Sequence, residues 1–343
     1  AATDNQIDIG AANVTADATI NGGTGDINTG ALTLADGATL TVGTGGSGAP
    51  TIASVTGANG GGTASNLTLN TTGAASVGAV GTNIGTVTVT QSGGTTFSST
   101  VGAATVALTD TTGTIQFDGT LTATDLTAAA GGYNVSLLGG STITNAVTFN
   151  NTGSTQIGNA TGDTNTFNGG VTATAGAVTA AGTIATSEDA LTLGAVTLVE
   201  AQTLTLDTAN SGGGNIAVAS LTGESGGSAE NVTLESGSGT ITVSGAIGTD
   251  IGTLTLQENN AGATGAVSLA GNVAANTLTT FARGYDVSLT GAVNSITTDT
   301  TFLNTGAITI GDAAGDSSTF VGGLDTTAGG TENFAGMVAA TNN

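Results

Sequence analysis

Apolar and polar residues alternate along many short runs of this chain. Residues 86–90 read Thr-Val-Thr-Val-Thr, residues 203–206 read Thr-Leu-Thr-Leu and residues 240–243 read Thr-Ile-Thr-Val. Alternation with a period of two, carried by β-branched residues, is typical of strands that bury one face. Clusters rich in Gly, Asn, Asp and Ser separate these runs, which indicates turns, and no long helical pattern occurs. The pattern therefore predicts an all-β protein.

Long segments of the chain occur twice. The sequence GTNIGTVTV that starts at Gly81 returns as GTDIGTLTL at Gly248, and IGNATGDTNTFNGG at Ile157 returns as IGDAAGDSSTFVGG at Ile310. Repetition on this scale is typical of arrays and solenoids. We assign a first repeat unit to residues 1–184, with an N-terminal assembly strand, and a second to residues 185–343, with a C-terminal assembly strand.

Composition favours one of two all-β architectures. Tandem β-sandwich domains fill the space between their sheets with aromatic residues, whereas a β-solenoid, or β-helix, fills its coils with ladders of aliphatic side chains. Only 3% of this chain is aromatic and Trp is absent. We therefore predict a β-solenoid made of two tandem repeat units, with about 20 to 25 residues in each coil, and keep tandem β-sandwich domains as the alternative.

Three aromatic positions recur in both repeats, and we expect them to fill wider coils. The pairs are Tyr133 with Tyr285, Phe149 with Phe302, and Phe167 with Phe320. A carbohydrate-binding platform is the alternative for these side chains.

The charge of the chain excludes several kinds of partner. It carries 24 acidic residues against a single basic one, giving a formal net charge of −23. Nucleic acid and anionic membrane surfaces require basic residues, so neither is an expected partner. No apolar run is long enough to span a bilayer, which predicts no membrane insertion. Cys is absent, so disulfides and thiolate metal sites are excluded.

Acidic residues in two equivalent turns are candidate calcium ligands. Asp163 lies in the sequence GNATGDTN, and Asp312 and Asp316 lie in its counterpart GDAAGDSS. Calcium prefers clustered oxygen ligands, so these three residues form a candidate metal site. The alternative is that each aspartate caps its own turn through backbone amides.

The residues of the chain offer little for catalysis. His, Lys and Cys are absent, and no pair of carboxylates stands out as a general acid and base. We therefore expect no enzymatic activity and no catalytic residue. Calcium is the one candidate cofactor, and carbohydrate or a cell surface remains a candidate partner.

The two ends of the sequence resemble the junction between the repeats. Residues 1–11, AATDNQIDIGA, resemble residues 185–195, ATSEDALTLGA, and the final AGMVAATNN resembles AGTIATSED from Ala181. A second copy placed against either end would imitate the internal junction. We therefore predict a head-to-tail homopolymer joined through Ile7 and Ile9 at one end and Met337 and Val338 at the other. The start AATDN also looks like a mature terminus after signal cleavage.

The pattern of short strands and turns in the sequence resembles the repetitive β-strand regions of large secreted bacterial adhesins, such as filamentous-haemagglutinin-like proteins and autotransporter passengers. The resemblance covers most of the chain but carries over no functional residue. It implies a β-helix exposed on the cell surface. We expect a secreted, extracellular, self-assembling filament subunit, of the kind found in fibres and biofilms, with the stalk of a giant adhesin as the alternative.

Overall fold

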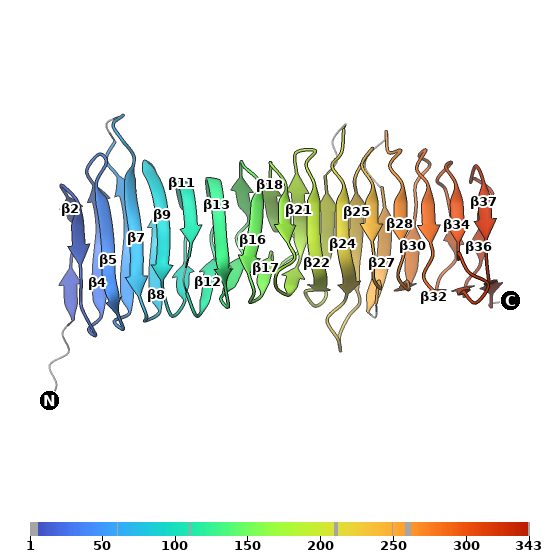
Figure 1. The fold of residues 1–343 in the computed structure, drawn as a ribbon, viewed down its shortest axis with the longest axis horizontal. Helices are drawn as coiled ribbons and strands as arrows, with labels where there is room; N and C mark the ends of the chain where they lie inside the picture. The colour runs from blue at the N-terminus through green and yellow to red at the C-terminus, as the bar shows by residue number, and fades with distance from the viewer. Residues whose placement is uncertain are drawn as a thin grey trace. The chain divides into compact units, whose positions relative to one another are not determined.

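A computed structural model of the chain describes residues 6–59, 61–109, 111–208, 212–248, 250–257 and 262–341. Within these residues every regular element is a β-strand, and no helix that could cross a membrane occurs among them. The chain divides into two compact units, Ala1–Ile157 and Gly158–Asn343. We describe each unit by itself (Figure 1).

Unit 1 is built of short strands joined by tight turns. In chain order they are β1 (Ile7–Ile9), β2 (Ala12–Val14), β3 (Ala18–Ile20), β4 (Ile27–Leu34), β5 (Thr39–Gly46), β6 (Pro50–Gly57), β7 (Ser65–Thr71), β8 (Ala75–Val80), β9 (Ile84–Gln91), β10 (Thr95–Phe97), β11 (Val101–Leu108), β12 (Thr114–Phe117), β13 (Leu121–Gly131), β14 (Asn134–Leu137), β15 (Ser141–Ile143), β16 (Val147–Asn151) and β17 (Thr155–Ile157).

Strands of successive coils pair in parallel on three faces of unit 1. One face runs from β1 through β4 and β6 to β17, a second from β2 to β15, and a third from β3 through β5, β7 and β9 to β16. Strands β4 and β6 each turn a corner and serve two faces. Three short parallel strands per coil, each paired to the next coil, make unit 1 a β-solenoid.

Inward-facing side chains of neighbouring coils stack on one another. Leu67 pairs with Val87 and Val87 with Val106, and all three are fully buried. Phe97 pairs with Phe117, and their rings stack with centroids 4.8 Å apart. Aliphatic ladders of this kind fill the coil because parallel in-register pairing places like residues directly above one another.

Unit 2 has the same construction. Its strands are β18 (Thr164–Phe167), β19 (Val171–Ala173), β20 (Val178–Ala180), β21 (Gly182–Thr186), β22 (Leu191–Leu198), β23 (Thr203–Asp207), β24 (Ile216–Thr222), β25 (Glu230–Glu235), β26 (Ile241–Val243), β27 (Ile251–Leu256), β28 (Val267–Leu269), β29 (Ala274–Ala275), β30 (Thr277–Thr279), β31 (Val287–Leu289), β32 (Val293–Ile296), β33 (Thr300–Thr301), β34 (Ile308–Ile310), β35 (Ser317–Phe320), β36 (Leu324–Asp325), β37 (Glu332–Phe334) and β38 (Met337–Ala340).

Three parallel ladders organise unit 2. Ladder 1 contains β18, β21, β23, β25, β27 and β30. Ladder 2 contains β19, the first half of β22, the first half of β24, β26, β28, β31, β34 and β37. Ladder 3 contains β20, the second halves of β22 and β24, bridges at Ile247 and Val273, and then β29, β32, β35 and β38. Strands β33 and β36 form a separate pair.

The β-solenoid prediction is confirmed. Parallel pairing between successive coils replaces the antiparallel hairpins that a β-sandwich would contain. The number of residues from one coil to the next varies, from 18 between Val178 and Val196 to 28 between Leu206 and Leu234. This range is wider than expected because turns, rather than strands, absorb the insertions. The compact units meet at residue 157, whereas our repeat boundary follows sequence similarity and lies at residue 184.

The recurring aromatic residues lie inside the coils, as predicted. Tyr133, Tyr285, Phe149, Phe302, Phe167 and Phe320 are all buried. The single hydrogen of the Tyr133 hydroxyl can be donated to the carbonyl oxygen of Ala129, at 2.8 Å, or to that of Leu108, at 3.2 Å. Burial raises the pKa of Tyr133 to about 12. None of these six rings offers a surface to a carbohydrate.

Equivalent repeat segments lie in different ladders of unit 2. Strand β18 ends at Phe167 and belongs to ladder 1, whereas its sequence counterpart β35 ends at Phe320 and belongs to ladder 3. The same holds for β21 and β38, which belong to ladders 1 and 3. The sequence repeat therefore does not correspond to a whole number of three-strand coils. An alternating strand fits any face, because each face requires only an apolar inner side.

Candidate functional site

The first coil of unit 1 presents a partly open core. Strand β1 pairs with β4, β2 with β4 and β3 with β5, and these three strands have no other partner strand among the described residues. Their inward residues are only half-buried, in contrast to the fully buried Leu40 of β5. A hollow of about 310 Å³ opens beside Ile9, Val14 and Ile20, with Leu32 and Leu40 among its lining residues.

The last coil of unit 2 exposes apolar side chains. Strand β37 pairs only with β34, β38 with β35 and β36 with β33, within the described part of the chain. Phe334 on β37 and Met337 on β38 are 50% and 55% exposed. Figure 1 shows β36 and β37 at the red end of the ribbon. Both coils thus carry strand edges whose backbone groups can pair with a further strand.

The structure places the four predicted assembly residues on the outermost strands of these coils. Ile7 and Ile9 are the half-buried inward residues of β1. Val338 points inward from β38, in the same row as Ser318, whereas Met337 points outward. The role of these four residues in assembly stays a prediction.

Phe334 was missed by the sequence reasoning. It lies on the inward row of β37 and opposite Ile310, yet half of its surface is exposed. The sequence signal was available, because Phe334 occupies the position that Ala180 fills in the first repeat, directly before the matched Ala-Gly pair.

The candidate calcium residues form two copies of one turn. The Oδ2 atom of Asp163 accepts hydrogen bonds from the backbone amides of Asn159, at 2.8 Å, and Ala160, at 2.9 Å. Asp316 accepts from the amides of Asp312 and Ala313, both at 2.8 Å. Each turn starts at a glycine with φ of +74°, Gly158 or Gly311. A side chain there would be strained and would collide with the carbonyl of the next coil.

Two backbone amides hold the Oδ2 atom of Asp163, and two others hold that of Asp316. The two amide donors lower the pKa of Asp316, because they stabilise the charged carboxylate. Asp312 contributes its amide to the turn and lies beside Asp316. Among the described residues no group of three or more acidic side chains is arranged to hold a metal ion. Calcium binding at Asp163, Asp312 and Asp316 therefore stays a prediction from sequence.

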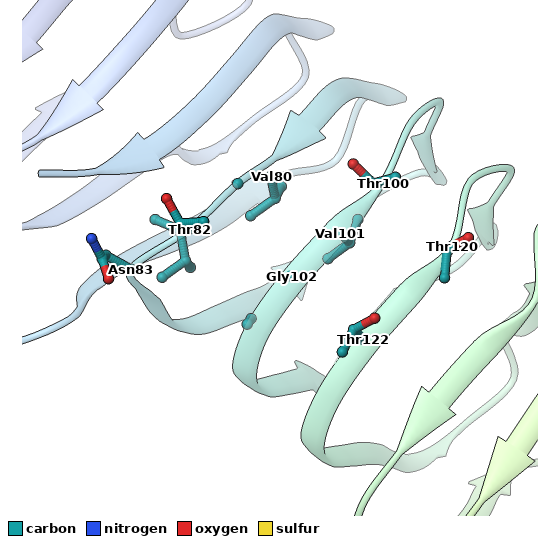
Figure 2. Close-up of a pocket in the computed structure, with 11 residues that line it drawn as sticks. Val80, Thr82, Asn83, Thr100, Val101, Gly102, Thr120 and Thr122 are labelled. Carbon is teal, nitrogen blue, oxygen red and sulfur yellow. The ribbon is translucent and has the colours of Figure 1, made fainter. Parts of the chain in front are cut away.

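A lateral groove crosses three coils of unit 1. Its volume is about 580 Å³, and its lining includes Val101, Gly102 and Thr122 on neighbouring strands, with Thr82 and Asn83 on the turn between β8 and β9 (Figure 2). A Cβ atom added at Gly102 would lie in ordinary van der Waals contact, 3.8 Å, with the carbonyl oxygens of Val80 and Gly81. The residues that line the groove carry hydroxyl, amide and aliphatic groups but no titratable side chain. The groove can therefore make hydrogen bonds and van der Waals contacts but holds no acid or base for catalysis.

The chain was compared with protein-family models, with curated proteins and with solved structures, and no match was found in any of the three comparisons.

Proposed function

We propose that this chain is a non-enzymatic structural subunit of an extracellular filament, joined head to tail by strand pairing between the C-terminal coil of one copy and the N-terminal coil of the next. The observation that carries the proposal is the pair of incompletely covered coils at β1–β3 and β36–β38. Addition of a strand to an open edge satisfies its backbone groups and buries its inward side chains.

Two further features support a cohesive role. The two coils are different surfaces, so pairing between them is heterologous and can continue indefinitely, whereas a self-complementary patch would close into a dimer. The chain has a formal net charge of −23 with a single basic residue, and the resulting repulsion opposes lateral aggregation of filaments. Secretion and display at the cell surface belong to the same proposal.

The stalk of a giant adhesin is the second candidate. Stacked coils without an identified catalytic cluster also suit a spacer that holds a binding tip away from a cell. In that case the coils at β1–β3 and β36–β38 would pair with covalently linked neighbours. The length of the polypeptide distinguishes the two candidates, because an adhesin stalk requires a much longer chain.

Sedimentation of the purified chain tests the proposal. A filament subunit should form a broad series of species that grows with protein concentration, without a preferred end point. A monomer at every concentration, or a closed dimer, would contradict head-to-tail assembly. The folded state should be followed by circular dichroism in the same samples, so that unfolded aggregates are recognised.

A further inference from the structure

The last coil of unit 2 is a second copy of the coil formed by β19, β20 and β21. Gly182, the first residue of β21, and Gly336, directly before β38, both have φ of +74°. In each case the following amide donates to the carbonyl of the turn aspartate, Asp163 or Asp316, at 2.8 Å. The segments that precede them align as well, since Phe-Asn-Gly-Gly-Val ends at Val171 and Phe-Val-Gly-Gly-Leu ends at Leu324. Strands β36, β37 and β38 therefore correspond to β19, β20 and β21.

Within the chain, β22 and β23 cover the first of these two coils. The register of that contact is defined by three strand pairs, namely Val171 with Leu191, Ala180 with Leu198, and Ile184 with Leu206. All six residues are buried. This contact shows what the β19–β21 coil binds when a further coil is present.

The first coil of unit 1 is a copy of that covering coil. Residues 7–14, Ile-Asp-Ile-Gly-Ala-Ala-Asn-Val, align without a gap to residues 191–198, Leu-Thr-Leu-Gly-Ala-Val-Thr-Leu. Strand β3 then takes the place of β23, with Ile20 and Leu206 both on the inward side. The coil of β36–β38 therefore duplicates one side of the internal contact, β19–β21, and the coil of β1–β3 duplicates the other side, β22 and β23.

We propose that the last coil of one chain pairs with the first coil of a second copy in the register of the internal contact. Leu324 then lies opposite Ile7 of the second copy, Phe334 opposite Val14 and Val338 opposite Ile20. This inference rests on the proposed function and adds to it the register of the joint. The partner is a second copy of this chain, because the first coil repeats the segment that already covers β19–β21.

Side-chain volumes support this partner. The first coil carries smaller inward residues than its internal counterpart: Ala12 for Val196, Val14 for Leu198 and Ala18 for Leu204. On the last coil Phe334 replaces the smaller Ala180, whereas Val338 replaces the larger Ile184. The hollow of about 310 Å³ beside Val14 offers room for the exposed ring of Phe334. Small residues on one surface thus compensate for a large residue on the other.

The register also places like charges at the joint. Asp325 lies opposite Asp8 of the second copy, where the internal contact pairs Thr172 with Thr192. Glu332 lies opposite Ala12 on the inward row of β37, the row that also carries Phe334, so its carboxylate does not face another acid. Acids facing one another across parallel strands repel, and salt screens this repulsion. Assembly should therefore strengthen as ionic strength rises.

Disulfide trapping in this chain tests the register. The chain has no cysteine, so any disulfide that forms must join introduced cysteines. The double variant Asn13→Cys with Asn333→Cys places both thiols on outward positions that should face each other, as Thr179 and Thr197 do internally. Neighbouring strands lie about 4.8 Å apart, within the range that a disulfide bridges. The matched control, Asp8→Cys with Asn333→Cys, joins strands that the register keeps on different faces.

The expected result is a ladder of covalent multiples of 32.1 kDa on a non-reducing gel for the first variant and not for the control. If the unmodified chain forms filaments but only the control variant cross-links, the proposed register is wrong and the filament proposal still holds. A chain that forms no filaments and no covalent ladder would overturn both.

Discussion

Two coils of unit 2 have closely related sequences but different burial. In the coil of β19–β21, Ala180 and Ile184 are fully buried beneath β22 and β23. In the coil of β36–β38, the equivalent Phe334 is half exposed and Val338 is only partly covered. The backbone turn that precedes both is the same. Burial of a solenoid strand is therefore determined by the next coil along the axis, and a strand sequence specifies only which side faces inward.

Truncation of equivalent core residues should give the largest difference between these coils. Ile184→Ala should lower the free energy of unfolding by about 2 to 5 kcal/mol, because it leaves a cavity between two coils. Val338→Ala should cost about 1 kcal/mol or less in the unassembled chain, because its surroundings can relax. Denaturant unfolding followed by circular dichroism measures both. Equal losses would contradict the comparison.

Removal of the exposed ring should separate assembly from folding. Phe334→Ala should leave the stability of the unassembled chain nearly unchanged, yet raise the concentration at which polymers form by at least about tenfold, equivalent to about 1.4 kcal/mol. Phe320→Ala is the matched control, since that ring is fully buried and packs edge-on against Phe302. The control, Phe320→Ala, should lower the free energy of unfolding of the unassembled chain. Unchanged polymer formation by the Phe334 variant would count against a joint at β37.

The aspartate turns should respond alike in both coils, because their partners are local. Asp163→Ala and Asp316→Ala each remove the acceptor of two backbone amides, so we expect similar losses of thermal stability. If Asp163→Ala lowers thermal stability several times more than Asp316→Ala does, contact with the neighbouring coil also contributes to the stability of the turn. Added calcium tests the calcium hypothesis in the same assay, and an unchanged melting temperature would count against it. A rise in melting temperature with calcium that both variants abolish would instead support the calcium hypothesis.

The acid sensitivity of one of these turns follows from its pKa. The pKa of Asp316 is lowered in the folded chain, so its carboxylate contributes stability above the unfolded-state pKa of about 3.9. That contribution is lost as pH falls through the folded-state value. Asp316→Asn should remove this part of the pH dependence, measured by thermal unfolding between about pH 2 and pH 6. An unaltered acid profile would exclude this role.

The smallest effect is expected from charge at the joint. Asp8→Asn should lower the concentration required for polymer formation by about twofold to fivefold at low salt and by less at high salt, since it removes one of two facing carboxylates. Asp118→Asn, on a turn in the middle of unit 1, is the control and should have no such effect. A larger effect at high salt than at low salt would contradict a repulsive pair.

Much of the fold follows from the sequence, because alternation and repetition are local signals. Period-two runs such as residues 86–90 form strands with their apolar side inward, and low aromatic content favoured the solenoid. The face that each strand occupies could not be derived in this way. Strands β18 and β35 match in sequence and lie in different ladders, because the number of turns before a strand, rather than its residues, sets its face.

The candidate site was predictable in part. The outermost strands and the turn aspartates were located from the repeat, since both copies preserve them. Phe334 and the hollow beside Val14 required the structure, because exposure of an inward residue depends on whether another coil covers it. Substitution of a large residue for a small one at a repeated inward position is the sequence signal that points to such a surface.

Electron microscopy of the purified chain over a range of protein and salt concentrations tests the central claim most directly. The account predicts uniform filaments that lengthen with concentration, form more readily at high salt and require a higher protein concentration in the Phe334→Ala variant. Folded single particles under every condition, with or without calcium, would contradict assembly by this chain and favour the stalk of a longer adhesin.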